Sequence, residues 1–550
     1  MNLPWLTILI LVPLFGGIVV AGLGAEQRRL VRGLALAFSL VALTGALCLW
    51  MHFDAMSGNL QFVEKHDWVP SLGIQYFLGV DGLGLLMVML TAIVVPLSIL
   101  ASGSLFDGGA GSPLPAAGAR DDGGAHGLSR HSQATAEVTR PTQGGAHIYY
   151  ALVLWLQAGL FGTFTALNFF HWFLFWELVL IPAFFLIKLW GGPKRGPAAT
   201  QFFIYTMVGS VTLLLSFLAI RLATGSFDFI ELADLAKRGE ITAKLGDAIG
   251  WKSHIGLLVF FGAFLGFAVK VPVVPFHTWL PAAYTEAPGP VTMLFTGVIS
   301  KMGVYGFLRI LLPIFPEQIR LVLTPLMWLA VLTIVLSACA AFAQRDLKRI
   351  LAYSSINHLG YCLLALFAVM GAATGVNQPE LQKAAALNGV LLQMFNHGLT
   401  ASALFLFVWL IEKRSGGLRG LEDFGGIRKV VPVFTGLMGI ALFSSLGLPG
   451  LNGFVGEFLI FKGVFPLAPW AAALSTVGLL VTAIFLLTLI QRVFCGPLNM
   501  RWAQMPDLTL SERLLVAVPI ALMFVLGIWP QFVLGMVDAT VVKMVQQLNF

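Results

Sequence analysis

Long apolar stretches separated by short polar segments run along almost the whole chain. A stretch of about 20 apolar residues is long enough to cross the hydrocarbon core of a membrane as a helix. The pattern therefore predicts an all-α, polytopic membrane protein with about fourteen transmembrane helices, so that both termini lie on one side. The predicted spans lie near 3–24, 31–51, 80–101, 148–166, 168–190, 202–223, 254–270, 287–312, 321–342, 351–372, 386–411, 430–447, 470–494 and 513–537.

Two of the predicted spans are interrupted by helix-breaking residues. The seventh meets Pro272 and Pro275 and continues with apolar sequence beyond them, and the twelfth meets a Gly- and Pro-rich break and resumes from residue 453. Such residues free backbone groups that are tolerated at membrane depth only inside a protein or a polar cavity. Because the interruptions are five spans apart, we predict two inverted five-helix repeats, spans 4–8 and 9–13, with broken helices 7 and 12.

This pattern divides the chain into parts with distinct compositions. The segment between the third and fourth spans is rich in Gly, Ala, Ser and Thr, which is typical of a disordered loop. A second polar stretch, 224–253, mixes acids and bases with apolar residues and is compatible with a short surface helix. The parts are 1–101 (spans 1–3), 102–147 (polar loop), 148–312 (first repeat), 321–494 (second repeat) and 495–550 (C-terminal span).

Composition and charge support a membrane protein and exclude a soluble one. Apolar residues make up 58% of the chain and charged residues 11%, against about 25% charged in ordinary soluble domains. The net charge of +7 does not indicate a nucleic-acid partner, because Lys and Arg lie in short clusters between apolar runs. The positive-inside rule then favours both termini on the outer, periplasmic side of a bacterial inner membrane, with only Lys270 and Lys301 as bases within spans.

The sequence contains no recognisable cofactor or metal motif. Its four cysteines are scattered singly, so they lack the spacing of an iron–sulfur or zinc site. It also lacks a phosphate-binding loop, a dinucleotide fingerprint and a nucleophile elbow. We therefore expect no cofactor or metal bound by this chain, and we look for its chemistry among ionisable side chains inside the spans.

Three ionisable residues stand within apolar runs of the first predicted repeat. Glu177 lies in NFFHWFLFWELVLIP, Lys270 ends GLLVFFGAFLGFAVK, and Lys301 lies near the middle of VTMLFTGVISKMGVYGFLRI. An ionisable residue at membrane depth costs roughly 2.5–3.5 kcal/mol on insertion scales, so it persists only with a partner or a role. A structural tie between helices is the alternative for Glu177, and contact with lipid headgroups is the alternative for Lys270. We expect all three to take part in proton transfer.

Histidines stand near or within spans of both predicted repeats, His277 in the first and His358 and His397 in the second, and the second repeat also carries an acid, Glu457. Neutral imidazole can accept a proton at one nitrogen and release one from the other. We favour a relay role for His397, whereas for His277 and His358 a relay and a packing role are equally open. Glu457 follows the second helix break. We expect it to take part in proton transfer, and the alternative is that it is an acid at the membrane edge without such a role.

Several long strings match one family. VKVPVVPFHTWLPAAYTEAP, GVISKMGVYGFLR, RDLKRILAYSSINHLGY, MFNHGLTASALF and GLPGLNGFVGEF resemble the antiporter-like subunits of respiratory complex I, and the match spans about residues 75–500. This resemblance implies an ion pair between Glu177 and Lys270 and a relay at Lys301. In order along the implied proton path, the residues are Glu177, Lys270, Lys301, His358, His397 and Glu457.

The resemblance also implies an activity and partners. The chain would be a proton-translocating membrane-arm subunit of NADH:quinone oxidoreductase, without a redox centre of its own, embedded in the lipid bilayer beside other antiporter-like subunits. NADH, FMN, iron–sulfur clusters and quinone would belong to partner subunits. Departures from the family pattern are Tyr284 where His is frequent, Gly289, Pro290 and Val291 where many members read Thr-Ala-Gly, and the long 102–147 segment.

Two other functions stay open at this point. One is a cation/proton antiporter subunit, against which Glu457 argues mildly, because those relatives usually carry lysine there. The other is a membrane subunit of a hydrogenase-type or carbon-uptake complex. The subunits that copurify with the chain would separate these possibilities.

Overall fold

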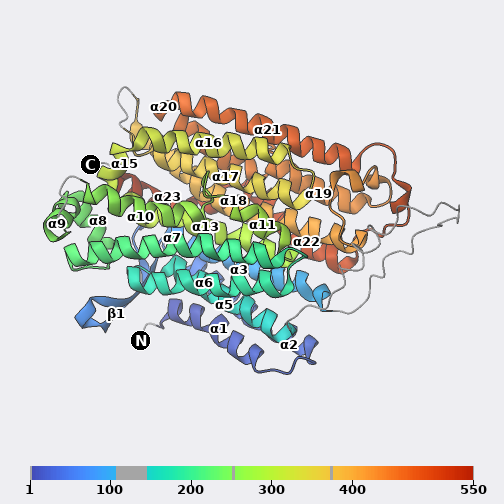
Figure 1. Ribbon diagram of the computed structural model, residues 1–550, viewed down its shortest axis with the longest axis horizontal. Helices are drawn as coiled ribbons and strands as arrows, with labels where there is room; N and C mark the ends of the chain where they lie inside the picture. The colour runs from blue at the N-terminus through green and yellow to red at the C-terminus, as the bar shows by residue number, and fades with distance from the viewer. Residues whose placement is uncertain (1–2, 107–144, 250–253, 372–375, 549–550) are drawn as a thin grey trace.

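The structure, a computed structural model, describes residues 3–106, 145–249, 254–371 and 376–548 (Figure 1). Most of these residues belong to helices that run side by side along the long axis of the molecule. In the described part, eleven helices are long and apolar enough to cross a membrane, and three shorter apolar helices accompany them. The predicted polytopic helical fold is confirmed, whereas the count of fourteen spans and the inverted repeats stay predictions.

The helices of the first half include the interrupted seventh span. They are α1 (Trp5–Ala21), α2 (Arg28–His52), α3 (Gly82–Ala101), α5 (Ala146–Thr165), α6 (Phe169–Trp190), α7 (Arg195–Thr224), α8 (Phe229–Lys237), α9 (Glu240–Ile249), α10 (Ile255–Lys270) and α11 (Trp279–Glu286). The eighth span contains two wider π-helical turns. Its segments are α12 (Gly289–Leu294), η4 (Phe295–Ile299), α13 (Ser300–Gly306), η5 (Phe307–Leu311) and α14 (Leu312–Ile314).

The second half contains the longest helix, α18, which lies at the centre of the bundle. Its helices are α15 (Pro316–Leu321), α16 (Leu323–Phe342), α17 (Leu347–Ala368), α18 (Pro379–Ser415), α19 (Pro432–Ser445), α20 (Asn452–Leu467), α21 (Pro469–Phe494), α22 (Leu510–Ile528) and α23 (Gln531–Leu548). Helix α18 packs against α17, α20, α12 and α3, and nearly its whole middle section is buried. It therefore connects the two halves of the molecule.

Both predicted helix breaks are present. Helix α10 ends at Lys270, and α11 starts only at Trp279. In the second half, α19 ends at Ser445 and α20 starts at Asn452. Gly447 lies in the turn between them with φ +81°, a backbone conformation that other residues adopt only with strain. The breaks thus occur where proline and glycine prevent a continuous helix.

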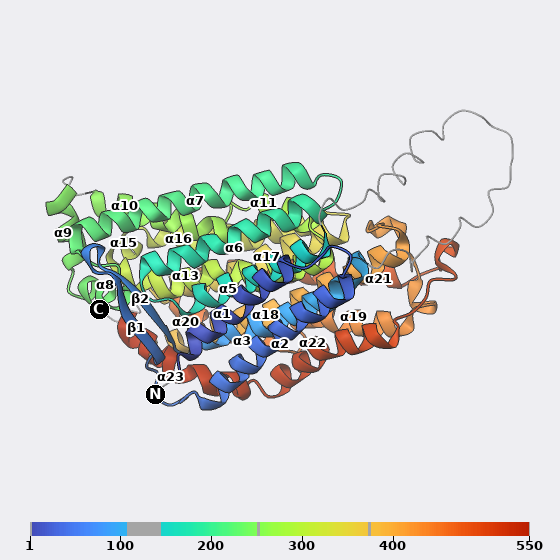
Figure 2. The same cartoon turned by 90° about the horizontal axis from the view of Figure 1, so that it is seen from below.

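Both chain termini lie at one end of the molecule, together with α8, α9 and a β-hairpin (Figures 1 and 2). We call this end the terminus end. The prediction that the termini share a side agrees with this arrangement, and the side of the membrane on which they lie stays a prediction.

The hairpin is an element that the hydrophobic pattern did not predict. Strand β1 (Gln61–Val69) pairs antiparallel with β2 (Ile74–Val80), so the predicted helical fold carries one short hairpin in addition. A short 3-10 turn joins the strands, and further 3-10 turns connect other helices. These turns are Pro70–Leu72, Ser102–Leu105, Leu421–Asp423, Ile427–Lys429 and Met500–Trp502.

The structure also corrects the prediction for the last span and adds detail to the predictions for the two polar segments. The predicted last span, 513–537, is two helices, because α22 ends at Ile528 and Pro530 precedes α23. Proline cannot donate the hydrogen bond that a continuous helix needs. In the stretch 224–253 two short helices form, α8 and α9. Most of the predicted polar loop, residues 107–144, lies outside the described residues.

Candidate functional site

Four of the six predicted site residues meet in the middle of the bundle. Lys301 Nζ on α13 lies 2.9 Å from His397 Nδ1 on α18. His358 Nδ1 on α17 lies 2.7 Å from Glu457 Oε1 on α20. The two imidazole rings stand 5.1 Å apart between their centroids, and all four side chains are buried. We call Lys301, His397, His358 and Glu457 the proton series.

Lys301 is held in place by an irregular stretch of helix. The π-helical turns η4 and η5 lie on either side of the α-helical segment that carries it. Such wide turns occur mostly as single insertions in α-helices, frequently at functional sites. The Lys301 ammonium also donates to the carbonyl of Thr296 and to Ser300 Oγ. Its position is therefore fixed by its own helix as well as by His397.

Polar side chains from α18 and from the end of α19 contact Glu457 and His358. Gln393 Nε2 donates to Glu457 Oε1 at 3.2 Å, and Ser445 Oγ lies 3.2 Å from His358 Nε2. A cavity of about 10 Å³ lies between the two histidines and Glu457, which is about the space that one water molecule needs. Its walls are His358, Gln393, His397, Thr400, Ser444, Ser445, Gly453 and Glu457.

The other two predicted residues are near each other but do not form the expected ion pair. The Lys270 ammonium lies 4.7 Å from the ring centroid of Trp176, in a cation–π contact. No salt bridge or hydrogen bond joins Lys270 to Glu177 within the described part of the chain, and Glu177 Oε1 is buried without a hydrogen-bond partner there. Neighbouring residues on a helix point about 100° apart. An ammonium that faces Trp176 therefore does not face Glu177 directly.

Lys270 and Lys301 belong to helices in close contact. A Cβ on Gly303 would approach the backbone nitrogen of Val271 to 2.8 Å, so α13 passes directly beside the end of α10. His277 lies apart from the proton series. It is in the α10–α11 break, with its ring 6.2 Å from that of Tyr353.

Sequence reasoning missed a charge cluster, which we define as Asp346, Lys348, Glu412 and Arg419, in which Lys348 and Glu412 are buried and the other two are partly exposed. Lys348 Nζ lies 3.0 Å from Glu412, and Arg419 contacts Glu412 at 3.2 Å and Asp346 at 2.5 Å. Burial opposes the charge of Arg419, but the two carboxylates outweigh it and raise the pKa of the guanidinium above its usual value. Lys348 lies in the first turn of α17 and its side chain is buried, although the sequence pattern places it in a connection between spans.

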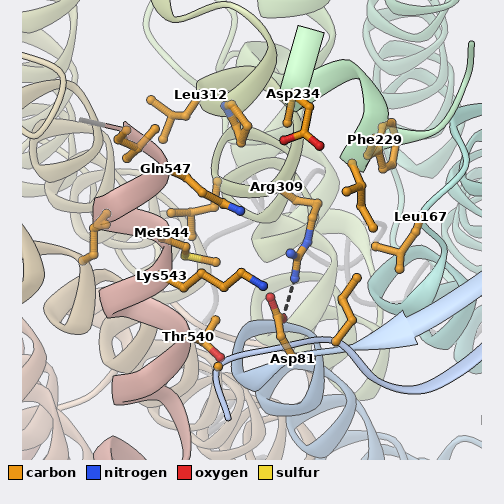
Figure 3. A pocket seen from close by; sticks show the side chains of 18 residues that line it. Asp81, Leu167, Phe229, Asp234, Arg309, Leu312, Thr540, Lys543, Met544 and Gln547 are labelled. Carbon is orange, nitrogen blue, oxygen red and sulfur yellow. Dashed lines mark hydrogen bonds and ion pairs between the residues drawn. The ribbon is translucent and has the colours of Figure 1, made fainter. Parts of the chain in front are cut away.

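A second missed pair lies near the terminus end. Arg309 Nη2 contacts Asp81 Oδ1 at 2.5 Å (Figure 3). The signal in the sequence is the apolar residues on both sides of Arg309, in GFLRILLP, a string that the hydrophobic pattern places at the end of a span. Within the described ranges, no group of three or more His, Cys, Asp or Glu could hold a metal ion.

Comparison with known proteins identifies the family. A family profile described as "NADH:quinone oxidoreductase/Mrp antiporter, TM" matches residues 166–484, more than half of the chain. The chain belongs to this family. The resemblance that the sequence motifs indicated is therefore confirmed.

Individual relatives agree with this assignment along the whole chain. The chain is 33% identical to NADH-quinone oxidoreductase subunit M of Mycobacterium tuberculosis, over 98% of this chain and 94% of the relative. Respiratory complex I from Thermus thermophilus contains a chain with a TM-score of 0.77 at 25% identity, covering 99% of this chain and all of that one. The Mrp complex from Dietzia shares the fold, with a TM-score of 0.78 at 19% identity and full coverage of both chains.

Proposed function

We propose that this chain is a proton-translocating membrane subunit of an NADH:quinone oxidoreductase, and that the proton series carries the proton. The main support for this proposal is that the four side chains of the proton series follow one another with only a water-sized gap. Two direct contacts, Lys301–His397 and His358–Glu457, flank a cavity the size of one water molecule. The sequence similarity to subunit M over nearly the full chain supports the choice of enzyme.

Proton transfer along the series needs only small movements. The Lys301 ammonium passes a proton to His397 Nδ1 and becomes a neutral amine. The imidazolium then releases a proton through water in the cavity to His358, which passes one to the Glu457 carboxylate. Histidine suits both middle positions because its two ring nitrogens can accept and donate in turn. The direction of transfer is set by charge changes at the two ends.

Glu177 and Lys270 extend this path on the other side of Lys301. A change in a neighbouring subunit that moved Glu177 would alter the field at Lys270. Because α10 passes directly beside α13, that change would reach Lys301. In this proposal Lys270 works through its charge and position, with its ammonium held over Trp176.

The proposal places the redox chemistry in partner subunits. NADH, FMN, iron–sulfur clusters and quinone would be bound there, and neighbouring antiporter-like subunits would flank this chain in a bacterial inner membrane, with both termini on the periplasmic side. The likeness to a chain of respiratory complex I from Thermus thermophilus supports an assembly of this kind. A cation/proton antiporter subunit is the second candidate, because the family description names both classes.

The test is made on the assembled complex in sealed vesicles. Lys301→Ala should lower the number of protons moved per electron, because a methyl group cannot carry a proton to His397. Glu457→Gln should do the same, because the amide keeps the size of the side chain but cannot take up and release a proton as a carboxylate does. Lys429→Ala is the control, because Lys429 is exposed at the end of the 3-10 turn Ile427–Lys429 and does not line the cavity of the proton series.

Two outcomes would contradict the proposal. Unchanged protons per electron in both Lys301→Ala and Glu457→Gln would exclude the proton series as the carrier. Sodium-dependent proton exchange in vesicles without any electron donor would instead favour the antiporter.

A further inference from the structure

The three helices that carry the lysine and the two histidines of the proton series are joined at one end by the side chain of Lys348. Lys348 Nζ on α17 lies 3.0 Å from Glu412 Oε2, near the end of α18, and donates to the carbonyl oxygen of Ala287 at 3.2 Å. Ala287 stands two residues before Gly289, where α12 begins and leads through η4 to α13. Lys348 and Glu412 are both buried. We call these two contacts of the ammonium the Lys348 tie.

The carbonyl of Ala287 is one of three consecutive carbonyls around the end of α11 that bind donors from different elements. Arg419 Nη1, after the end of α18, donates to the carbonyl of Thr285 at 3.1 Å. The backbone N–H of Gly192, after the end of α6, donates to the carbonyl of Glu286 at 2.8 Å. The last four carbonyls of a helix have no partner within it, and cations are favoured beside them. The end of the broken seventh span is therefore fixed to three other parts of the chain.

Further contacts join the same helices between this tie and the proton series. Thr296 on η4 has its hydroxyl 3.1 Å from Ser355 Oγ on α17, while its carbonyl accepts from the Lys301 ammonium. Ser402 Oγ on α18 donates to the carbonyl of Met293 on α12 at 2.9 Å. A displacement of α12 against α17 or α18 at the tie would therefore reach Lys301 through one of its own hydrogen-bond partners.

We propose that Lys348 is a positioning residue for proton transfer, because the Lys348 tie sets the spacing of the helices that carry Lys301, His358 and His397. This role rests on the proposed function, since the spacing matters only if protons pass along the series. Lys301 Nζ lies 2.9 Å from His397 Nδ1, and a hydrogen bond is lost by about 3.6 Å. A helix shift of less than about 1 Å would thus interrupt transfer, and misplacements of this size can slow a reaction about 100-fold.

An ion pair is not needed merely to fill the space between α17 and α18. Replacing a buried ion pair by apolar residues of similar volume is often neutral or stabilising, and the best-supported role of such a pair is to fix helix register. Apolar side chains in place of Lys348 and Glu412 could pack there, but they could not bind the Ala287 carbonyl. Arg419, which also contacts Glu412, would keep its partner Asp346. Stability and positioning can therefore be separated by experiment.

The first test measures protons per electron and thermal stability in the assembled complex. Lys348→Met combined with Glu412→Leu removes both charges and keeps the space filled. Its melting temperature should match that of the parent, because no buried charge is left bare. It should lose at least half of the protons per electron that Lys301→Ala loses, because the Ala287 carbonyl is released. Lys348→Arg should keep the parent value, because a guanidinium has donors for both the carboxylate and the carbonyl.

A second ion pair on α18 provides the matched control. Arg414 Nη2 lies 2.5 Å from Glu512 Oε2, and their side chains are 9% and 17% exposed. This pair joins α18 to α22 instead of to α12 or α17. Arg414→Met with Glu512→Gln removes the pair, and glutamine can keep the capping box of α22. Its protons per electron should equal those of the parent. An equal loss in this control would show a general effect of removing a charge pair, and the positioning role would be wrong.

The second test measures helix spacing without any proton assay. Thr296→Cys and Ser355→Cys, in a chain whose four native cysteines are replaced by alanine, should form a disulfide quickly with a membrane-permeant oxidant, because the hydroxyl oxygens that they replace are 3.1 Å apart. Lys348→Met should slow this reaction severalfold, because α12 is released from α17. Glu412→Gln breaks the same ion pair but leaves the contact with the Ala287 carbonyl, so it should keep the parent rate.

The outcomes separate the positioning role from the proposed function. If the double variant of Lys348 and Glu412 keeps the parent protons per electron while Lys301→Ala loses them, the positioning role is wrong and the proton series stands. If Lys301→Ala also keeps the parent value, the proposed function itself fails. If the double variant melts early or does not assemble, the disulfide rates decide. Equal slowing in Lys348→Met and Glu412→Gln, or no slowing in either, would show that the Lys348 tie does not set the helix spacing.

Discussion

Lys348 is buried in the structure although the sequence around it is polar. By sequence it stands in a polar segment, RDLKR, which the hydrophobic pattern places in a connection between spans. In the structure its side chain is 4% exposed and that of its partner Glu412 is 9% exposed. Lys348 also donates to the carbonyl of Ala287, just after the α11 segment of the broken span. Its partners come from distant parts of the chain, so a local pattern could not reveal them.

Removing one partner of this buried pair should be costly. Glu412→Gln leaves the Lys348 ammonium buried without a counter-charge, and breaking a buried pair typically costs about 3–5 kcal/mol. We expect the free energy of unfolding in detergent to fall by about 3 kcal/mol, measured by denaturant titration of the purified chain or complex.

Glu422→Gln is the matched control for that substitution. Glu422 pairs with Arg345 at 3.8 Å, but these side chains are 64% and 81% exposed. Exposed pairs contribute little, so the change should stay within about 0.5 kcal/mol. Equal effects of the two substitutions would show that the buried Lys348–Glu412 pair does not stabilise the fold.

Among the helices and strands, the hydrophobic pattern predicted the features that depend on proline, on glycine or on the length of an apolar run. Helix breaks were predicted correctly because Pro272 and Gly447 act on their own backbone. The hairpin β1–β2 was missed because its polar residues face outward and its short strands carry no long apolar run. The division of the last span was missed because apolar residues continue past Pro530.

The break between α19 and α20 depends on close packing at Gly453. A Cβ at this position would lie 1.9 Å from the carbonyl oxygen of Ser444. Gly453→Ala must therefore push α20 away from α19, and overpacking of this kind costs about 1–3 kcal/mol. We expect lower thermal stability in detergent and fewer protons per electron, because Glu457 lies one helical turn further along α20.

Gly439→Ala, on α19, serves as the control for the break. Nothing lies within 4 Å of a Cβ added to Gly439, and alanine is favoured over glycine inside a helix by roughly 0.5–1 kcal/mol. Its melting temperature should therefore equal or exceed that of the parent. If both alanine variants melt together, steric contact at the break is not what positions α20.

For the whole molecule, the sequence could indicate which residues belong to the site but not how they pair. Lys301, His358, His397 and Glu457 were candidates because of their polarity in apolar runs and the family resemblance. Their contacts, Lys301 with His397 and His358 with Glu457, depend on the packing of α13, α17, α18 and α20. The Lys270 ammonium over Trp176 likewise depends on the orientation of α6 relative to α10.

On each of the two flanks of the molecule a carboxylate, Glu177 or Glu457, lies beside an exposed apolar surface. Helices α1 and α6 face one flank, and α20 and α21 face the other (Figures 1 and 2). A groove of about 520 Å³ on α20 and α21 reaches Glu457, and Glu177 is only half-buried on α6. An ionisable group facing lipid costs roughly 2.5–3.5 kcal/mol. We therefore expect neighbouring protein subunits, rather than lipid, to cover both flanks.

Cross-linking in native membranes can test this arrangement. Ile181 on α6 and Phe458 on α20 are each 52% exposed in the isolated chain. Ile181→Cys and Phe458→Cys, labelled with a short reagent that has a maleimide at one end and a photoreactive diazirine at the other, should each form a cross-link to a different partner subunit on illumination. Leu215→Cys, on the exposed surface of α7, is the control. It should react with a lipid-soluble maleimide but form no cross-link. If Leu215→Cys cross-links while Ile181→Cys and Phe458→Cys react only with the lipid-soluble reagent, the flanks face lipid, and Glu177 and Glu457 must be protected by the chain itself.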